Sequence, residues 1–252
     1  MRLIAHHKQT NTMIKKQMIL AVMFFLVLSL GYSQTTTEFF EKTDTFLKKF
    51  VKEGRVDYKA IKSDASGLDE LLDMAKNISV SKENSRAYQA FWVNGYNLLV
   101  IKGVVENYPI NSPLDVGGFF DKSKHEIGGT NITLNDIENK LLRGNFPSEP
   151  RFHFVLVCAG LGCPPIINTA YNPTTLDSQL ESQTKKALNN PDFIRVEKNK
   201  VKISQIFEWY KDDFTKNGKS VADFINHYRT EKLPENAKVS YYPYDWTLNA
   251  IK

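Results

Sequence analysis

The chain contains little cysteine and no long hydrophobic run. Of its 252 residues only 2 are cysteines, Cys158 and Cys163, so it can form at most one internal disulfide. The longest apolar run, residues 18–30, is shorter than the roughly 20 residues that cross a bilayer as a helix. Internal repeats, low-complexity tracts and a glycine-rich phosphate loop after a predicted strand are also lacking. These absences argue against a repeat architecture and give no support for nucleotide binding.

The first 33 residues have the order of a secretory signal peptide. Lys15 and Lys16 precede the apolar run, and the small residues Gly31 and Ser33 follow it. We therefore predict cleavage after Ser33 and an exported protein, periplasmic or secreted, with no membrane association after cleavage. The alternative is an uncleaved membrane anchor, which the short apolar run disfavours.

The basic character of the chain belongs largely to this predicted leader. The sequence has 33 lysines and arginines against 28 acidic residues, and four of the basic residues but no acidic residue fall within residues 1–33. Residues 34–252 are therefore almost neutral, and no basic stripe interleaved with aromatic residues is found in them. We expect no nucleic-acid partner and a single domain over residues 34–252.

The first half of this domain is predicted to be helical. Apolar residues recur at helical spacing in residues 38–54, which Gly54 ends, and in residues 59–76. Residues 85–107 form a longer predicted helix that is apolar on most sides and ends before Pro109. This third helix should be the buried centre of the domain.

The second half changes to shorter elements. Residues 124–134 read as a hairpin turning at Gly128 and Gly129, and Thr133 resembles the cap of a helix over residues 136–142. The remaining predictions are a buried strand over 152–157, a helix from 174 or 175 to 188, a hairpin over 193–204, and two short helices over 204–213 and 220–228. Together they predict an α+β fold in which N-terminal helices surround a long buried helix packed on a small antiparallel sheet.

The stretch RFHFVLVCAGLGCPP, residues 151–165, holds both cysteines and His153. On a straight strand His153 and Cys158 would lie about 16 Å apart on opposite faces. The glycines and prolines that follow allow the chain to fold back. That would bring Cys163 near His153 or near Cys158, though not near both.

Four interpretations of this stretch remain open. The cysteines can form a disulfide, which is common in exported proteins. Cys163 can be a thiol nucleophile with His153 as its base. A zinc site would need a fourth ligand, and the spacing matches no usual zinc loop. In the last interpretation both cysteines act as small buried apolar residues beside a hydrogen-bonded histidine. We predict no metal and no cofactor.

Two polar residues interrupt the long apolar helix. Asn94 and Asn97 are three positions apart, so they share one face. An unpaired buried amide costs roughly 1–3 kcal/mol, so each should have a fixed partner. Either they cap or bridge backbone groups of the later hairpins, or they orient a ligand.

Several motifs resemble one protein family. They are GRVDY (54–58), AFWVNGYNLL (90–99), LNDIENKLLR (134–143), EPRFHFVLVCAGLGCPP (149–165) and YDWTLN (244–249). Together they resemble the domain-of-unknown-function family 547, with a family-like core over about residues 54–249. The resemblance implies a fold without an agreed activity. Its motif positions fall on Asn94, Asn97, Glu138, Arg151, His153, Cys158, Cys163 and Pro164. The family often has histidine where this chain has Asn139, which puts a shared metal or catalytic role at that position in doubt.

Two hypotheses about function follow from these residues. In the first, the domain is a thiol-dependent hydrolase or transferase acting on an unknown small molecule or peptide. Cys163 attacks, His153 accepts the proton, and Asn94 or Asn97 orients the substrate or an oxyanion. In the second, it is a noncatalytic envelope binding or scaffold module with a structural cysteine pair. Redox exchange is less expected, because the cysteines do not have the two-residue spacing of known redox motifs.

Overall fold

The computed structural model describes residues 35–252, of which residues 40–252 form one compact unit. The predicted signal peptide, residues 1–33, lies outside the described residues. Within the described part of the chain, no helix has both the length and the apolar character needed to cross a bilayer.

The first helical segment ends earlier than the sequence predicts. Residues 35–50 are helical, and a small hairpin follows, made of β1 (Val51–Lys52) and β2 (Arg55–Val56). Gly54 has a φ of 76°, so this glycine forms the hairpin turn and does not end the helix. The second predicted helix is divided into α2 (Tyr58–Ser63) and α3 (Ser66–Asn77), because Asp64 is extended between them.

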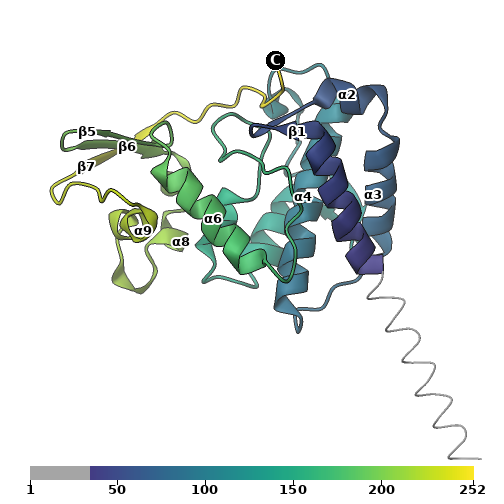
Figure 1. Cartoon of the computed structure of the whole chain (residues 1–252), viewed down its shortest axis with the longest axis horizontal. Coiled ribbons are helices and arrows are strands. Elements are labelled where there is room, and N and C mark those ends of the chain that lie inside the picture. The colour runs from purple at the N-terminus through teal and green to yellow at the C-terminus, as the bar shows by residue number, and fades with distance from the viewer. Residues whose placement is uncertain (1–34) are drawn as a thin grey trace, which may run out of the picture. The chain divides into compact units, whose positions relative to one another are not determined.

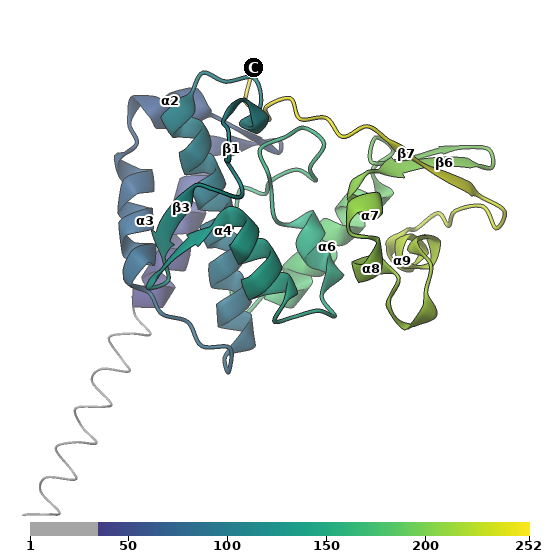
Figure 2. The same cartoon turned by 180° about the vertical axis from the view of Figure 1, so that it is seen from behind.

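The long helix α4 (Ser85–Asn107) confirms the prediction for residues 85–107. The side chain of Asn84 caps its first turn by accepting a hydrogen bond from the Ala87 N–H. Of its 23 residues, 16 are buried, which makes α4 the centre of the helical part. Helices α2 and α3 pack against it (Figure 1, Figure 2).

The predicted hairpin and the helix after it are also present. β3 (Lys124–Ile127) pairs antiparallel with β4 (Thr130–Thr133) through a turn at Gly128 and Gly129, both at positive φ. Thr133 then caps α5 (Leu134–Asp136), which continues as the π-helical segment η2 (Ile137–Arg143). A π-helical turn inside a helix is frequent at functional sites.

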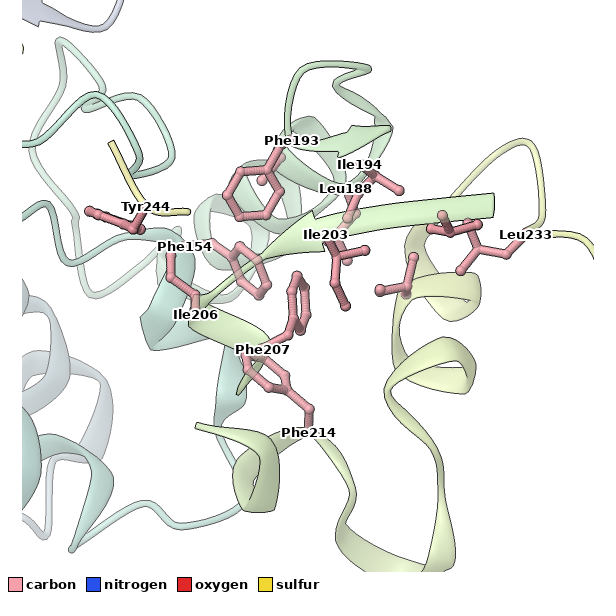
Figure 3. Close-up of a cluster of buried hydrophobic side chains, with 13 residues drawn as sticks. Phe154, Leu188, Phe193, Ile194, Ile203, Ile206, Phe207, Phe214, Leu233 and Tyr244 are labelled. Carbon is pink, nitrogen blue, oxygen red and sulfur yellow. The ribbon is translucent and has the colours of Figure 1, made fainter. Parts of the chain in front are cut away.

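The predicted strand over residues 152–157 is wrong. Residues Pro150–Phe154 form the 3₁₀ helix η3, and residues 155–157 belong to no strand. The Glu149 side chain accepts a hydrogen bond from the Arg151 N–H, and Pro150 occupies the first turn, so the segment starts as a helix does. Phe154 then points into a cluster of buried side chains with Phe193 and Phe207 (Figure 3).

A mixed sheet and short helices complete the fold. β5 (Ile194–Glu197) pairs antiparallel with β6 (Lys200–Ser204), which confirms the second predicted hairpin. β6 also pairs in parallel with β7 (Lys238–Tyr242), a pairing that the sequence does not predict. The remaining helices are η1 (Pro113–Asp115), α6 (Leu176–Asn189), α7 (Ile206–Trp209), α8 (Lys211–Phe214), η4 (Lys216–Gly218) and α9 (Val221–Tyr228). Helices with small, mainly antiparallel sheets confirm the α+β fold class.

Candidate functional site

The cysteine loop, residues 158–163, is held by the C-terminal segment of the chain. The Gly162 N–H donates to the Asp245 carbonyl at 2.7 Å, and the Leu161 N–H donates to the Thr247 carbonyl at 2.8 Å. A Cβ on Gly162 would lie 2.9 Å from the Asp245 nitrogen, so only glycine allows this approach. The motif YDWTLN thereby lies against the motif CAGLGC, although about 80 residues separate them in the sequence.

The two sulfurs and one tyrosine hydroxyl form a triangle. Cys158 Sγ lies 2.6 Å from Cys163 Sγ, and the Tyr244 hydroxyl oxygen lies 2.8 Å from each sulfur. Both cysteines are free thiols. The Cys158 N–H also donates to Cys163 Sγ at 3.1 Å, so the loop folds back as the glycines suggest and brings Cys163 to Cys158.

This triangle makes the two thiols unequal. The hydrogen bond from the Cys163 thiol lowers the pKa of Cys158 against the effect of burial, and the Tyr244 hydroxyl and the Gly160 N–H lower it further. Burial, reinforced by the neighbouring Cys158, raises the pKa of Cys163 well above its usual value. Cys158 is therefore the thiol that ionises first, and Cys163 keeps its proton.

The thiols line a cavity of about 310 Å³ where α4 meets the cysteine loop. Nearly half of the residues that line it are aromatic, and its polar residues include Asn135, Glu138, His153 and the two cysteines. The aromatic residues that line it are Tyr96, Phe120, Trp209, Tyr210, Tyr244 and Trp246. A cavity of this size and composition is typical of small-molecule sites.

His153 lines the same cavity but is bound to a carboxylate. Its Nε2–H donates to Asp213 Oδ2 at 2.8 Å, and the same oxygen accepts from Arg143 Nε at 2.6 Å. Burial acts against ionisation of Asp213, yet the hydrogen bonds from His153 and Arg143 hold the pKa of Asp213 well below its usual range. The His153 ring also lies 4.1 Å from the Tyr210 ring, measured between centroids. Within residues 35–252, no hydrogen bond joins His153 to Cys163.

Asn94 and Asn97 bind backbone and do not line the cavity. Asn97 accepts from the Val157 N–H and donates to the Val155 carbonyl, both at 2.9 Å. Asn94 makes the same two-sided contact with the backbone of Tyr171, at 3.0 and 2.7 Å. Each amide thus pairs with backbone groups as a neighbouring strand would. This agrees with the first of the two interpretations from the sequence, although the bonded segments are loops and not hairpins.

The other motif residues take different positions. Glu138 on η2 lines the aromatic cavity, whereas Pro164 is buried and lines a separate cavity of about 380 Å³. Arg151 lies outside both, where it binds Glu149 in a bidentate pair and contacts Asp177 and Glu181 of α6. That arrangement fixes η3 on α6.

No cluster of three or more histidine, cysteine or acidic side chains with the spacing of a metal site is found among the described residues. Asn139 accepts a hydrogen bond from Arg143 Nη1 and donates to Asn135. This residue thus supports Arg143, which in turn binds Asp213.

Reasoning from the sequence missed five residues of the site. Trp209 lies on α7, Asp213 lies on α8, and Tyr210 lies between these helices, where nothing in the local pattern marks them. Tyr244 and Trp246 belong to YDWTLN, a motif that the sequence does offer, but its contact with the cysteines depends on the tertiary fold.

Comparison with known proteins gives one match. Residues 80–187 match the family described as a protein of unknown function, DUF547, which confirms the resemblance seen in the motifs. The matched range contains α4, η2, η3 and the cysteine loop. No curated protein and no solved structure matches the chain.

Proposed function

We propose that this chain, which carries a DUF547 domain, is a thiol–disulfide exchange protein whose reactive group is the Cys158–Cys163 pair. The observation that carries the proposal is the sulfur separation of 2.6 Å at the wall of a cavity. Two sulfurs at this separation need to approach each other by only about 0.5 Å to reach the length of a disulfide bond. The cavity gives a small disulfide access to them.

The exchange has two steps that balance without a metal or cofactor. The Cys158 thiolate attacks one sulfur of a substrate disulfide, and the other substrate sulfur leaves as a thiolate that takes up a proton. Cys163 then loses its proton and attacks Cys158 Sγ, which releases the second substrate thiol. The substrate disulfide is reduced to two thiols, and the protein is oxidised to the Cys158–Cys163 disulfide.

Cys158 takes the attacking role in this proposal, in place of the Cys163 nucleophile expected from the sequence. Donors from Cys163, Tyr244 and Gly160 surround Cys158 Sγ and stabilise its thiolate. The His153 ring is bound to Asp213 and contacts neither sulfur in the described hydrogen bonds. We assign His153 a positioning role in the cavity wall.

The test is disulfide trapping with bis(2-hydroxyethyl) disulfide on the reduced protein. Wild type should lose two hydrogen atoms and carry no adduct, as seen by intact mass. Cys163→Ser should hold a mixed disulfide at Cys158, because the resolving thiol is missing. Cys158→Ser should react at least about tenfold more slowly, because burial, the largest cause of the raised pKa of Cys163, remains in this variant.

Two results would overturn the proposal. One is a Cys158→Ser protein that reacts as fast as Cys163→Ser. The other is a wild-type protein that retains two free thiols after full exposure to the disulfide. Circular dichroism of each variant shows whether it is folded, so that loss of reaction is not confused with loss of structure.

A second candidate is the scaffold module, and one observation favours it. The triangle of Cys158, Cys163 and Tyr244 fastens the C-terminal segment to the cysteine loop, so the thiols also have a structural use. In that case the wild-type protein would be oxidised slowly, and Cys158→Ser would be less stable than wild type. Cys163→Ser would then form no mixed disulfide.

Export is part of the proposal. The supporting observation is the order of charged, apolar and small residues over positions 13–33. In an exported protein the redox environment allows the pair to be cycled by disulfides outside the cytoplasm. The N-terminal residue of the mature protein, found by sequencing it from the native host, tests this; an intact leader would contradict it.

A further inference from the structure

The aromatic wall of the cavity is built from rings that contact one another. Trp209 lies 5.2 Å from Tyr244 and 6.3 Å from Trp246, and Tyr244 lies 4.7 Å from Trp246, all between ring centroids. Phe120 extends the group at 6.1 Å from Trp246. Trp209 is 47% exposed, which is unusual for so large an apolar side chain. A ligand that covered the Trp209 ring would remove this apolar surface from water.

One carboxylate faces this wall without a cation of its own. Glu138 is half-buried, lines the cavity, and accepts a hydrogen bond from the Tyr210 hydroxyl, but it takes part in no ion pair within residues 35–252. Arg143 is within electrostatic reach of Glu138, but its guanidinium is bonded to Asp213. Glu138 is also the one aspartate or glutamate among the residues that line the cavity.

We infer that the cavity binds an organic cation, an ammonium group that lies against the rings of Trp209, Tyr244 and Trp246 and opposite the carboxylate of Glu138. Electron-rich ring faces attract cations, and partly desolvated groups do so more strongly. A half-buried carboxylate that takes part in no ion pair within residues 35–252 adds a negative charge that a bound cation would balance.

This inference deepens the proposed function, on which its second half rests, because the thiols line the same cavity. A substrate disulfide with an ammonium group two methylene groups from its sulfur would place the cation on the aromatic wall while Cys158 attacks. The cation would also offset the charge of Glu138, which opposes ionisation of the nearby Cys158. Binding of such a substrate thus favours the reactive thiolate.

The first experiment tests cation binding without any redox chemistry. Choline and its neutral isostere 3,3-dimethyl-1-butanol are titrated by calorimetry into the reduced protein. Choline should bind at least about tenfold more tightly than the isostere. Glu138→Gln and Trp209→Leu should each weaken the binding of choline by about fivefold or more. Glu208→Gln, a matched change at an exposed neighbour of Trp209, should leave choline binding unchanged. Equal binding of the two probes, or binding of neither, would overturn the inference.

The second experiment tests the substrate class. Oxidation of the dithiol is timed with cystamine, which carries two ammonium groups, and with neutral bis(2-hydroxyethyl) disulfide. The ratio of the two rates in wild type should exceed the ratio in Glu138→Gln by about fivefold. Comparing ratios removes the general gain in reactivity expected when the charge near Cys158 is lost. An unchanged ratio refutes the substrate class.

The two ideas fail separately. If choline binds selectively but no mixed disulfide forms on Cys163→Ser, the cation site stands and the exchange function falls. If the mixed disulfide forms but neither choline nor cystamine is preferred, the exchange function stands and the cation site falls.

Discussion

Replacing Asn97 by alanine tests whether the long helix positions the reactive loop. Asn97 is 5% exposed, and its amide satisfies the Val155 carbonyl and the Val157 N–H just before Cys158. Alanine leaves both backbone groups buried and unpaired. A buried group that loses its partner costs about 1–3 kcal/mol, so the variant should lose about 2–4 kcal/mol of the free energy of unfolding.

The measurement is urea-induced unfolding of the reduced protein, followed by circular dichroism with the slope of the transition compared between variants. Asn107→Ala is the matched control, because the exposed Asn107 makes only a local bond to the Gly103 carbonyl in the last turn of the same helix. This control should stay within about 0.5 kcal/mol of wild type.

Asn97→Asp separates the two hydrogen bonds. An aspartate still accepts from the Val157 N–H, but it presents a carboxylate oxygen to the Val155 carbonyl. We therefore expect at least as large a loss as for alanine at neutral pH. If Asn97→Ala and Asn107→Ala lose equal stability, or if the alkylation rate of Cys158 is unchanged in a destabilised Asn97→Ala protein, the positioning role is refuted.

Two further predictions concern the loop and the histidine pair. Gly162→Ala should lower stability by about 1–3 kcal/mol, because the added Cβ would overlap the Asp245 nitrogen. Gly117→Ala is the control and should be nearly neutral, because its added Cβ meets nothing within 4 Å. Equal thermal unfolding of the two variants would contradict the close approach at Gly162. Asp213→Asn should lower stability near neutral pH by about 1–3 kcal/mol, because the variant loses the charge that His153 and Arg143 stabilise. The folded pKa of Asp213 lies below its unfolded value, so the stability that its charge contributes is complete above about pH 4 and is lost as the pH falls further. The difference in the free energy of unfolding between wild type and Asp213→Asn should therefore disappear in acid. A difference that does not change with pH would rule out the charge as its cause.

Local patterns predicted much of the secondary structure. Helix α4 follows from its apolar residues and the stop at Pro109, and both signals are local in the sequence. The turn at Gly128 and Gly129 and the cap at Thr133 are equally local, and both were predicted correctly. The α+β class follows from the order of these elements.

The apolar run over residues 152–157 shows where local patterns fail. A segment buried on all sides has no polar face, so its period does not distinguish strand from helix. The tertiary contacts decided between them, because Asn97 bonds the backbone groups that a neighbouring strand would otherwise use. The geometry that the sequence implied for His153 and Cys158 depended on that strand, and both side chains instead line one cavity.

The sequence alone therefore determined the long helix α4, the two predicted hairpins, the resemblance to one family and the presence of two cysteines in a glycine-bearing loop, since each depends on residues close together in the chain. Only the tertiary structure decided the reactive partners. Tyr244 comes to the sulfurs, and Asp213 to His153, from segments 81 and 60 residues away. Contacts over such separations depend on how the whole chain packs, which no local pattern encodes.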